Sequence, residues 1–234
     1  MGISIPKPSK LNVLARIYNA IPVTSIVDVG VRECTGELIQ CFPSKKHYLF
    51  EPVSLFFKDI ERNYSNINYQ LFPIALSNES SQIYLILTSL HKDGKVTHSK
   101  ISTQSVSIDG KDVVDCLPID VKRFDALALT STIDPNFLLK VDVDGQDLNV
   151  IKGFGSKLSL ASVVIIECTY LSAIERMGYL QSNGFQLIDI VDIVYYGQSL
   201  YQFDAVFVRK DMITVDLCPS ISAFKRELWQ PLQF

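Results

Sequence analysis

The chain has 234 residues and a mass of 26.3 kDa; hydrophobic residues make up 47% of it and charged residues 20%. This composition excludes a disordered chain, and the length predicts one large domain or a domain with a small appendage. The net charge is −3, with 22 Lys and Arg against 25 Asp and Glu, so the chain as a whole has no electrostatic attraction to nucleic acid or anionic lipid.

The cysteines and the N-terminal segment indicate a cytoplasmic protein. The five cysteines are widely spaced and form neither a CxxC pair nor a CxxC…H spacing, so no structural zinc site or disulfide framework is expected. The N-terminus lacks the basic and apolar regions of a signal peptide, and no uncharged apolar run approaches the roughly 20 residues of a membrane span. We therefore expect a cytoplasmic location, no membrane span and no nucleic-acid partner.

Predicted strands and helices alternate through most of the chain. An extended arm is expected at 1–10, and a helix at 11–20, where apolar residues recur at helical spacing. The predicted strands cover 26–30, 48–52, 69–76, 82–88, 113–119, 137–143, 162–168, 185–194 and 205–209. The predicted helices cover 36–42, 54–63, 121–129, 148–152 and 174–182.

This alternation predicts a doubly wound α/β fold with a mostly parallel sheet. The last two strands are separated only by the polar turn 196–202, so we expect an antiparallel hairpin at one edge of the sheet. The polar stretch 89–112 is interpreted as a long loop. Loops of this length without regular structure are usually functional or mobile. We expect a single domain over 1–234, with an N-terminal arm and helix (1–20), a core (21–210) and a C-terminal tail (211–234).

Acidic residues end four of the predicted strands. Ordinary turn chemistry explains one or two acids at such positions, but it explains four poorly. In open parallel sheets, ligands bind outside the carboxyl ends of the strands, so this edge is the expected functional site. The residues at these ends are Asp28 and Gly30, Glu51, Asp142 and Asp144, and Glu167.

The turn after the first strand has the features of a ligand-binding turn. Gly30 lets the backbone turn tightly, and the helix that follows offers free N–H groups. The turn is not a GxGxxG dinucleotide motif, because Arg32 stands at the position of the second Gly, and no Gly-Lys-Ser or Gly-Lys-Thr phosphate loop follows. The cofactor contacts expected here come from Asp28, Gly30, Val31, Arg32, Glu33 and Thr35.

Glu51 ends the second strand at an offset from the first that is typical of nucleoside binding. An acid roughly 20 residues after the first strand's turn can accept hydrogen bonds from the ribose hydroxyls. No glycine-rich cradle for phosphate lies between Gly30 and Glu51, which favours a nucleoside ligand without phosphates. S-adenosylmethionine is such a ligand, and its positive charge suits a rim of acids.

Several segments together resemble the successive motifs of the FkbM-type S-adenosylmethionine-dependent methyltransferases, over about residues 22–210. The resemblance implies a seven-stranded sheet with an antiparallel last strand and cofactor contacts that extend to Pro52, Ala75 and Asp142. It also implies methyl transfer to a hydroxyl of a sugar or glycan, or of another small natural product of the polyketide type. The segments are VDVG (27–30), FEP (50–52), AL (75–76), LKVDVDG (139–145), IIE (165–167) and FDAVFVR (203–209).

Two positions depart from the family pattern. Cys34 stands where the family usually has a second Gly, although Gly36 follows two residues later. Asp144 stands where the family usually has Glu, which shortens the side chain and keeps the charge. The first departure leaves an alternative open: a catalytically degenerate domain of the same fold that binds S-adenosylmethionine or a protein partner.

Asp142 and Glu167 are the candidate catalytic residues. Asp142 ends the central strand, where the methyl group is expected, and can act as general base or metal ligand; Glu167 on the neighbouring strand can complete that role. Lys140 lies two residues before Asp142 on the same face of the strand, so an ion pair between them is an alternative that can coexist with catalysis. Oxygen ligands from Asp142, Asp144 and Glu167 would suit Mg²⁺, so metal-assisted and metal-free transfer both stay open.

The remaining candidates are distributed along the chain. His47 is expected on the surface, and His91 and His98 are alternative bases if the stretch 89–112 covers the site. Acceptor recognition is expected from 89–112 and 195–202. Trp229 in the tail is a candidate packing or homodimer contact.

Overall fold

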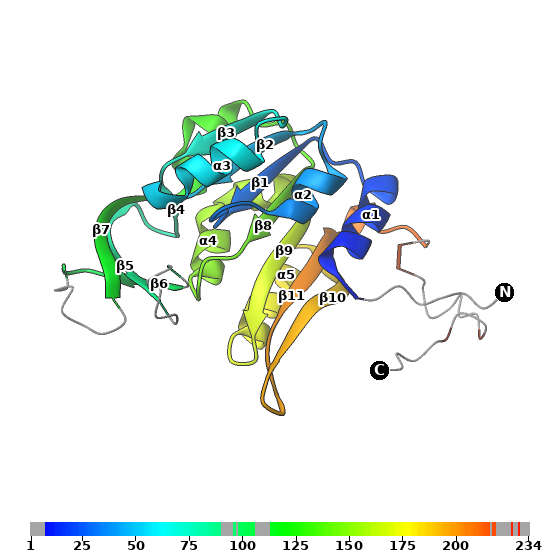
Figure 1. The fold of residues 1–234 in the computed structure, drawn as a ribbon. Coiled ribbons are helices and arrows are strands. Elements are labelled where there is room, and N and C mark those ends of the chain that lie inside the picture. The colour runs from blue at the N-terminus through cyan, green and yellow to red at the C-terminus, as the bar shows by residue number, and fades with distance from the viewer. Residues whose placement is uncertain are drawn as a thin grey trace.

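The computed structural model describes residues 8–89, 96, 98–105, 113–215, 217–218, 226 and 229. Within these residues a seven-stranded sheet forms the centre of the molecule (Figure 1). Every neighbouring pair in it is parallel except the two pairs that involve β11, which runs antiparallel to β9 and β10. The predicted mostly parallel sheet with an antiparallel edge hairpin is thus confirmed. In sheet order the strands are β10 (Phe185–Tyr196), β11 (Ser199–Arg209), β9 (Ala161–Thr169), β8 (Phe137–Val141), β1 (Ser25–Val29), β2 (Lys46–Phe50) and β3 (Tyr69–Phe72).

The central strands are buried on both faces, which makes the fold doubly wound. In β1, Ile26 packs into one core, whereas Val27 and Val29 pack into the other, because successive side chains of a strand point to opposite faces. Helices therefore cover both sides of the sheet (Figure 1). One face carries α1 (Lys10–Ala20), α2 (Gly36–Cys41) and α3 (Phe57–Asn63); the other carries α4 (Asp147–Gly153) and α5 (Ala173–Ser182).

A second, four-stranded sheet lies beside the first and was not predicted (Figure 1). Its apolar face packs against Val53, just after β2, and so covers part of the carboxyl edge of the main sheet. The residues of that face with the lowest exposure are Leu85, Leu87, Ile119 and Val121. In order, its strands are β4 (Ala75–Leu76), β7 (Val113–Lys122), β5 (Ser81–Thr88) and β6 (His98–Ser102).

Three predicted elements are wrong because of this second sheet. The expected strand 69–76 is two strands in different sheets, since Pro73 between them has no N–H for the ladder. The expected loop 89–112 contains β6, although residues 90–95, 97 and 106–112 lie outside the description. The expected helix 121–129 begins inside β7 and continues as two 3-10 turns, Phe124–Ala126 and Ala128–Ser131, because its apolar residues face two different cores.

Two smaller expectations are also corrected. His47 is fully buried rather than on the surface, because it lies in β2 between two other strands, with Nε2 3.0 Å from the Phe42 carbonyl oxygen. Burial lowers the pKa of His47. The hairpin strands reach Tyr196 and resume at Ser199, so most of the expected turn 196–202 is strand. No helix in the described part of the chain is long and apolar enough to cross a membrane.

Two helical glycines provide a test of how tightly the second sheet is joined to the main core. A Cβ at Gly153, the last residue of α4, would overlap the Ser77 carbonyl next to β4, whereas a Cβ at Gly178 in α5 would meet nothing within 4 Å. We expect Gly153→Ala to lower the free energy of unfolding by about 1–3 kcal/mol through overpacking. Gly178→Ala should raise it by up to about 1 kcal/mol through helix propensity. Urea unfolding measures both, and equal effects would contradict the close packing at Gly153.

Candidate functional site

The end of β1 and the end of β8 approach each other at Gly30. Gly30 has a φ of +81°, and a Cβ there would overlap the carbonyl of Asp142. The Gly30 N–H donates to the Phe50 carbonyl at 3.0 Å, and the Asp142 N–H donates to the Val29 carbonyl at 3.1 Å. Only glycine permits this approach, so Gly30 brings the ends of β1, β2 and β8 together.

Glu51, the first residue after β2, is a buried carboxylate in a fixed orientation. Its side chain is almost inaccessible, and its two oxygens accept hydrogen bonds from the N–H groups of Arg32 and Val53, each at 2.8 Å. Burial raises the pKa of Glu51 to about 7, and these two hydrogen bonds oppose the shift. Each oxygen keeps acceptor capacity for a ligand hydroxyl.

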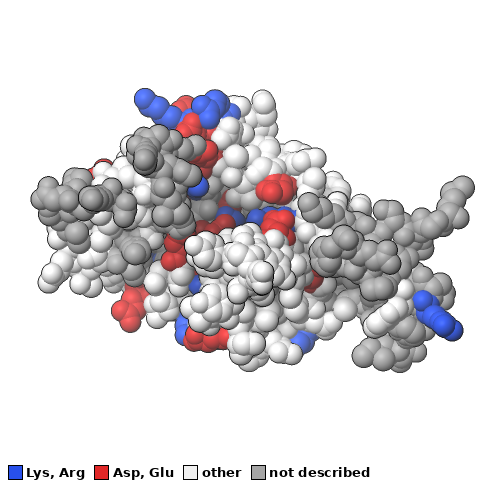
Figure 2. All heavy atoms as spheres, turned by 60° about the horizontal axis from the view of Figure 1, so that its bottom comes forward, with Lys and Arg blue, Asp and Glu red and all other residues white. Residues whose placement is uncertain are grey.

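A cavity of about 840 Å³ lies between this edge of the main sheet and the second sheet. Its size falls within the range of small-molecule sites. Figure 2 shows this end of the molecule, where a hollow has both acidic and basic side chains beside it. The cavity lining includes six of the predicted cofactor residues, namely Gly30, Arg32, Glu51, Pro52, Ala75 and Asp142, and also Asp144.

The other predicted cofactor residues do not line the cavity. Asp28 is fully buried below it, and Val31 packs in the core beside α3. Thr35 is also buried, and its N–H donates to the Tyr64 hydroxyl at 3.2 Å. The carbonyl of Glu33 accepts from the Asn63 amide at 3.0 Å. These residues hold the turn in place from behind.

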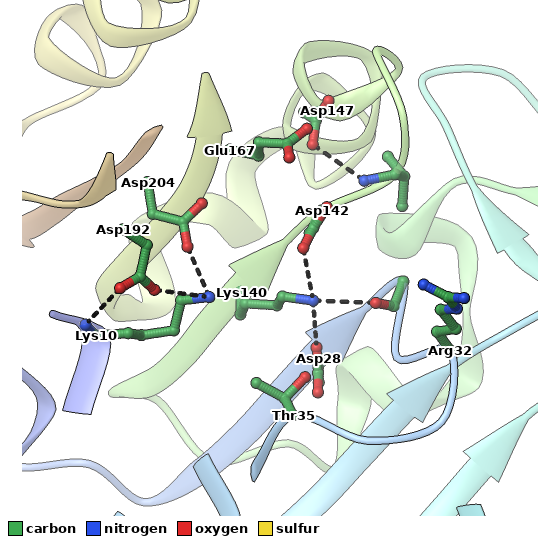
Figure 3. A network of polar contacts seen from close by, with 12 residues as sticks. Lys10, Asp28, Arg32, Thr35, Lys140, Asp142, Asp147, Glu167, Asp192 and Asp204 are labelled. Carbon is green, nitrogen blue, oxygen red and sulfur yellow. Dashed lines mark hydrogen bonds and ion pairs between the residues drawn. The ribbon is translucent and has the colours of Figure 1, made fainter. Parts of the chain in front are cut away.

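A buried lysine lies beneath the cavity (Figure 3). Lys140 Nζ donates to the Gly30 carbonyl at 3.0 Å and lies 3.4 Å from Asp28 Oδ1 and 3.5 Å from Asp142 Oδ2. Burial alone lowers the pKa of Lys140, but the attraction of Asp28 and Asp142 outweighs it and raises the pKa above its ordinary value. The expected pairing of Lys140 with Asp142 is present, and the more deeply buried partner, Asp28, was missed because it comes from the neighbouring strand.

Asp147 and Arg176, which the sequence analysis also missed, organise the loop after β8. Asp147 is fully buried, and its oxygens accept from the N–H groups of Val143 at 3.1 Å and Gly145 at 3.2 Å. Arg176 from α5 lies 2.9 Å from Asp147 Oδ2. An acid in the first turn of α4 was visible in the sequence, but its partner comes from a helix that only the fold brings close.

Asp144 connects the same loop to the second sheet. Its Oδ2 accepts from the N–H of Ser99 at 2.9 Å and from the Ser99 hydroxyl at 3.3 Å. Arg32 makes a second connection, since Nη2 donates to the Val96 carbonyl at 2.7 Å. These two contacts join both sides of the cavity to the segment that contains β6. The expected role of His91 lies outside the described residues, as does the side chain of His98.

Glu167 lies at the end of β9, outside the cavity lining. It points toward Asp142 and Asp147 (Figure 3), and its Oε1 accepts from the Gln202 amide at 2.9 Å. Burial, and then the repulsion of Asp142 and Asp147, raises the pKa of Glu167 to about 8. Among the described residues, no group of three or more His, Cys, Asp or Glu side chains is arranged to hold a metal ion, and the candidate ligands Asp142, Asp144 and Glu167 form no such group.

The sequence profile of the methyltransferase FkbM domain matches residues 26–187, well over half of the chain. The chain belongs to the FkbM methyltransferase family. A search of curated proteins finds no match. The methyl donor of this family is S-adenosylmethionine, and the acceptor is not determined by the match.

Solved methyltransferase structures are similar to this chain at low identity. One is a putative tRNA (m1A22) methyltransferase from Streptococcus pneumoniae in complex with S-adenosylmethionine: 13% identity over 86% of this chain and 72% of that chain, with a TM-score of 0.47. Another is an rRNA methylase from Streptococcus thermophilus: 9% identity over 88% of this chain and 99% of that chain, with a TM-score of 0.49. Likenesses at this level carry no argument about the acceptor.

The cavity fits S-adenosylmethionine in its charge and its hydrogen-bonding groups. Glu51 offers a buried, oriented acceptor for ribose hydroxyls, and Gly30 lets the backbone lie close to the cavity. The charged residues of the lining are four acids, Glu51, Glu79, Asp142 and Asp144, and one base, Arg32. An excess of carboxylates complements the positive sulfonium of this donor.

Removal of one partner from the buried pair of Arg176 and Asp147 should be strongly destabilising. Arg176→Met leaves the Asp147 carboxylate buried without its cation, so we expect the free energy of unfolding to fall by about 3–5 kcal/mol. The control is Arg62→Met, which removes an exposed pair with Asp59 (2.6 Å apart) and should cost less than about 1 kcal/mol. Urea unfolding of both variants tests this, and losses of similar size would contradict the role of the buried pair.

Proposed function

We propose that the protein is an S-adenosylmethionine-dependent O-methyltransferase that acts on a hydroxyl of a sugar, a glycan or another small natural product. The observation that carries the proposal is the carboxylate of Asp142. It lines the same cavity as the buried Glu51, its side chain is 40% exposed, and Lys140 holds it from below. A carboxylate in this position can accept the proton of an acceptor hydroxyl.

The residues that would hold the cofactor surround the Gly30 turn. Glu51 would accept hydrogen bonds from the ribose, Pro52 and Ala75 would contact the adenosine, and Gly30 and Arg32 would line the side next to Asp142. When bound, S-adenosylmethionine supplies an electrophilic methyl group. The protein therefore mainly has to position the donor and the acceptor and to exclude water. The second sheet supports the exclusion of water, because it covers the cavity with aliphatic side chains.

Glu167 has a supporting role in this proposal. Its pKa of about 8 makes it mostly protonated at neutral pH, so it can donate a hydrogen bond to the acceptor and is a poor base. Asp142 is therefore the proposed base, without a metal ion. Cys34, on which the non-catalytic alternative depends, is exposed and outside the cavity lining, which supports the catalytic proposal over that alternative. We also propose a cytoplasmic location, in keeping with five cysteines of which none forms a disulfide in the described structure.

The affinity for the cofactor should depend on the ionisation of Glu51. Its carboxylate form accepts from the ribose, and its pKa is about 7, so protonation below pH 7 competes with binding. We expect the affinity for S-adenosylhomocysteine, measured by calorimetry, to be about tenfold weaker at pH 6 than at pH 8. Glu51→Gln should bind about 2 kcal/mol more weakly at pH 8 and lose most of this pH dependence.

The matched control for that experiment is Glu79→Gln. Glu79 also lines the cavity but is exposed, so this variant should keep the pH dependence of the wild type. An unchanged affinity in Glu51→Gln would contradict the placement of the ribose.

The charge of Asp142 should matter for turnover and little for stability. Asp142→Asn keeps the shape of the side chain, and Lys140 keeps its contacts with Asp28 and the Gly30 carbonyl. The free energy of unfolding should therefore change by less than about 1 kcal/mol. Turnover should fall by roughly 10²–10⁴-fold, the usual effect of a positioned base. The assay follows S-adenosylhomocysteine released with a panel of sugar and natural-product acceptors.

Two outcomes would contradict this assignment. A variant that unfolds readily but keeps its turnover when folded would make Asp142 only a partner of Lys140. Reversible loss of wild-type activity in EDTA would replace the metal-free base with a metal-assisted step.

A further inference from the structure

A group of exposed tyrosines lies at the end of the β10–β11 hairpin. The hairpin projects beyond the sheet at the lower end of Figure 1, beside the loop that follows β9. We call this group the tyrosine surface; it consists of Tyr170, Leu171, Tyr195, Tyr196 and Tyr201, of which Tyr196 is 81% exposed. The Tyr170 N–H donates to the Tyr201 carbonyl at 3.0 Å, and the rings of Tyr196 and Tyr201 are 6.2 Å apart. Loop and hairpin therefore lie side by side; Tyr196 and Tyr201 share one face of the hairpin, and Tyr195, next to Tyr196 in β10, points to the other face.

Folding does not account for these exposed rings. None of the five residues belongs to a hydrophobic core of the described structure, and the hairpin strands are paired by their backbones. A cluster of large exposed apolar side chains on a soluble domain usually marks a binding surface.

The tyrosine surface is joined to the proposed site of methyl transfer. Tyr170 directly follows β9, three residues after Glu167. Tyr201 directly precedes Gln202, and the amide of Gln202 donates a hydrogen bond to Glu167 at 2.9 Å. Glu167 in turn points toward Asp142 on the cavity wall (Figure 3). Polar side chains thus lead from the cavity to the tyrosines.

The charges around the tyrosines select the chemistry of the ligand. The sequence has no Lys or Arg between Arg176 and Arg209, whereas Asp189, Asp192 and Asp204 lie in this stretch. Among the described residues, two cations reach the hairpin and both are paired: Lys10 with Asp204 at 2.6 Å and Asp192 at 3.5 Å, and Arg16 with Asp189 at 3.0 Å. Phosphate-bearing partners, including nucleic acid and anionic lipid, need unpaired cations, and the described residues of this surface offer none.

A neutral, polyhydroxylated chain fits both features. Tyrosine offers an apolar ring face, on which the C–H face of a sugar ring can stack, and a hydroxyl that donates and accepts hydrogen bonds. The carboxylate of Asp142 can accept from sugar hydroxyls, the protonated carboxyl of Glu167 can donate to them, and the amide of Gln202 can do both.

We propose that the tyrosine surface is a second subsite, which binds a neutral oligosaccharide portion of the acceptor at a distance from the hydroxyl that is methylated. The inference rests on the proposed function and specifies its acceptor: an extended, uncharged glycan rather than a single sugar or a compact natural product.

Binding of neutral hexasaccharides tests the subsite. The probes are maltohexaose, cellohexaose and mannohexaose, each measured by NMR saturation transfer and calorimetry on the full chain with S-adenosylhomocysteine present. The wild type should bind at least one of them, and the double variant Tyr196→Ala/Tyr201→Ala should bind it about tenfold more weakly, because two stacking faces are lost. The control is Tyr18→Ala, which removes an exposed tyrosine of α1 and should leave this affinity unchanged. All three proteins should bind S-adenosylhomocysteine equally.

Several results would overturn the inference. These are a wild type that binds no hexasaccharide, a double variant that binds as tightly as the wild type, and a wild-type dimer that the double variant dissociates in sedimentation. Binding to phosphatidylserine vesicles that depends on the two tyrosines would also overturn it. If the wild type binds a hexasaccharide but no S-adenosylhomocysteine, the proposed function fails, and the surface is a carbohydrate-binding surface but not an acceptor subsite.

Discussion

The close approach of the β1 turn to the end of β8 is the constraint on which the site depends. It requires a residue without a side chain at Gly30, because any Cβ there would overlap the carbonyl of Asp142. Lys140 stabilises the approach from below, where its ammonium group donates to the Gly30 carbonyl between Asp28 and Asp142. One buried cation thus fixes the relative positions of the cofactor turn and the proposed base.

The charged groups near this contact are arranged in pairs that favour a single geometry over maximal stability. Buried ion pairs seldom add net stability, since the loss of hydration offsets much of the attraction. Here each pair positions a loop: Asp147 with Arg176 holds the backbone after β8, and Lys140 with Asp28 holds the turn after β1. Glu51 completes the arrangement, because its hydrogen bond to the Arg32 N–H connects that turn to β2.

The second sheet converts an open sheet edge into a covered cavity. Its aliphatic face lies opposite Glu51 and Asp142, and the contacts of Asp144 with Ser99 and of Arg32 with the Val96 carbonyl close its far side. The hairpin end, in contrast, stays open and carries tyrosines. A covered pocket for the cofactor and an open surface for the acceptor would suit a protein whose donor is small and whose acceptor is extended.

The sequence by itself determined the main sheet, the edge hairpin and the residues at the strand ends, because strands such as β1 and β9 are marked by local apolar runs that end in Gly or an acid. Gly30, Glu51 and Asp142 could be identified from that pattern, and all three line the cavity.

Only the tertiary structure decided which residues pair across strands and which side of the sheet is covered. Asp28 with Lys140 and Asp147 with Arg176 come from separate elements, His47 is buried because β2 is an interior strand, and Glu167 is left outside the cavity. The second sheet escaped prediction for the same reason: strands at 82–88 and 113–119 were expected, but no local pattern shows that they pair with each other and with the short β4 and β6 in a separate sheet.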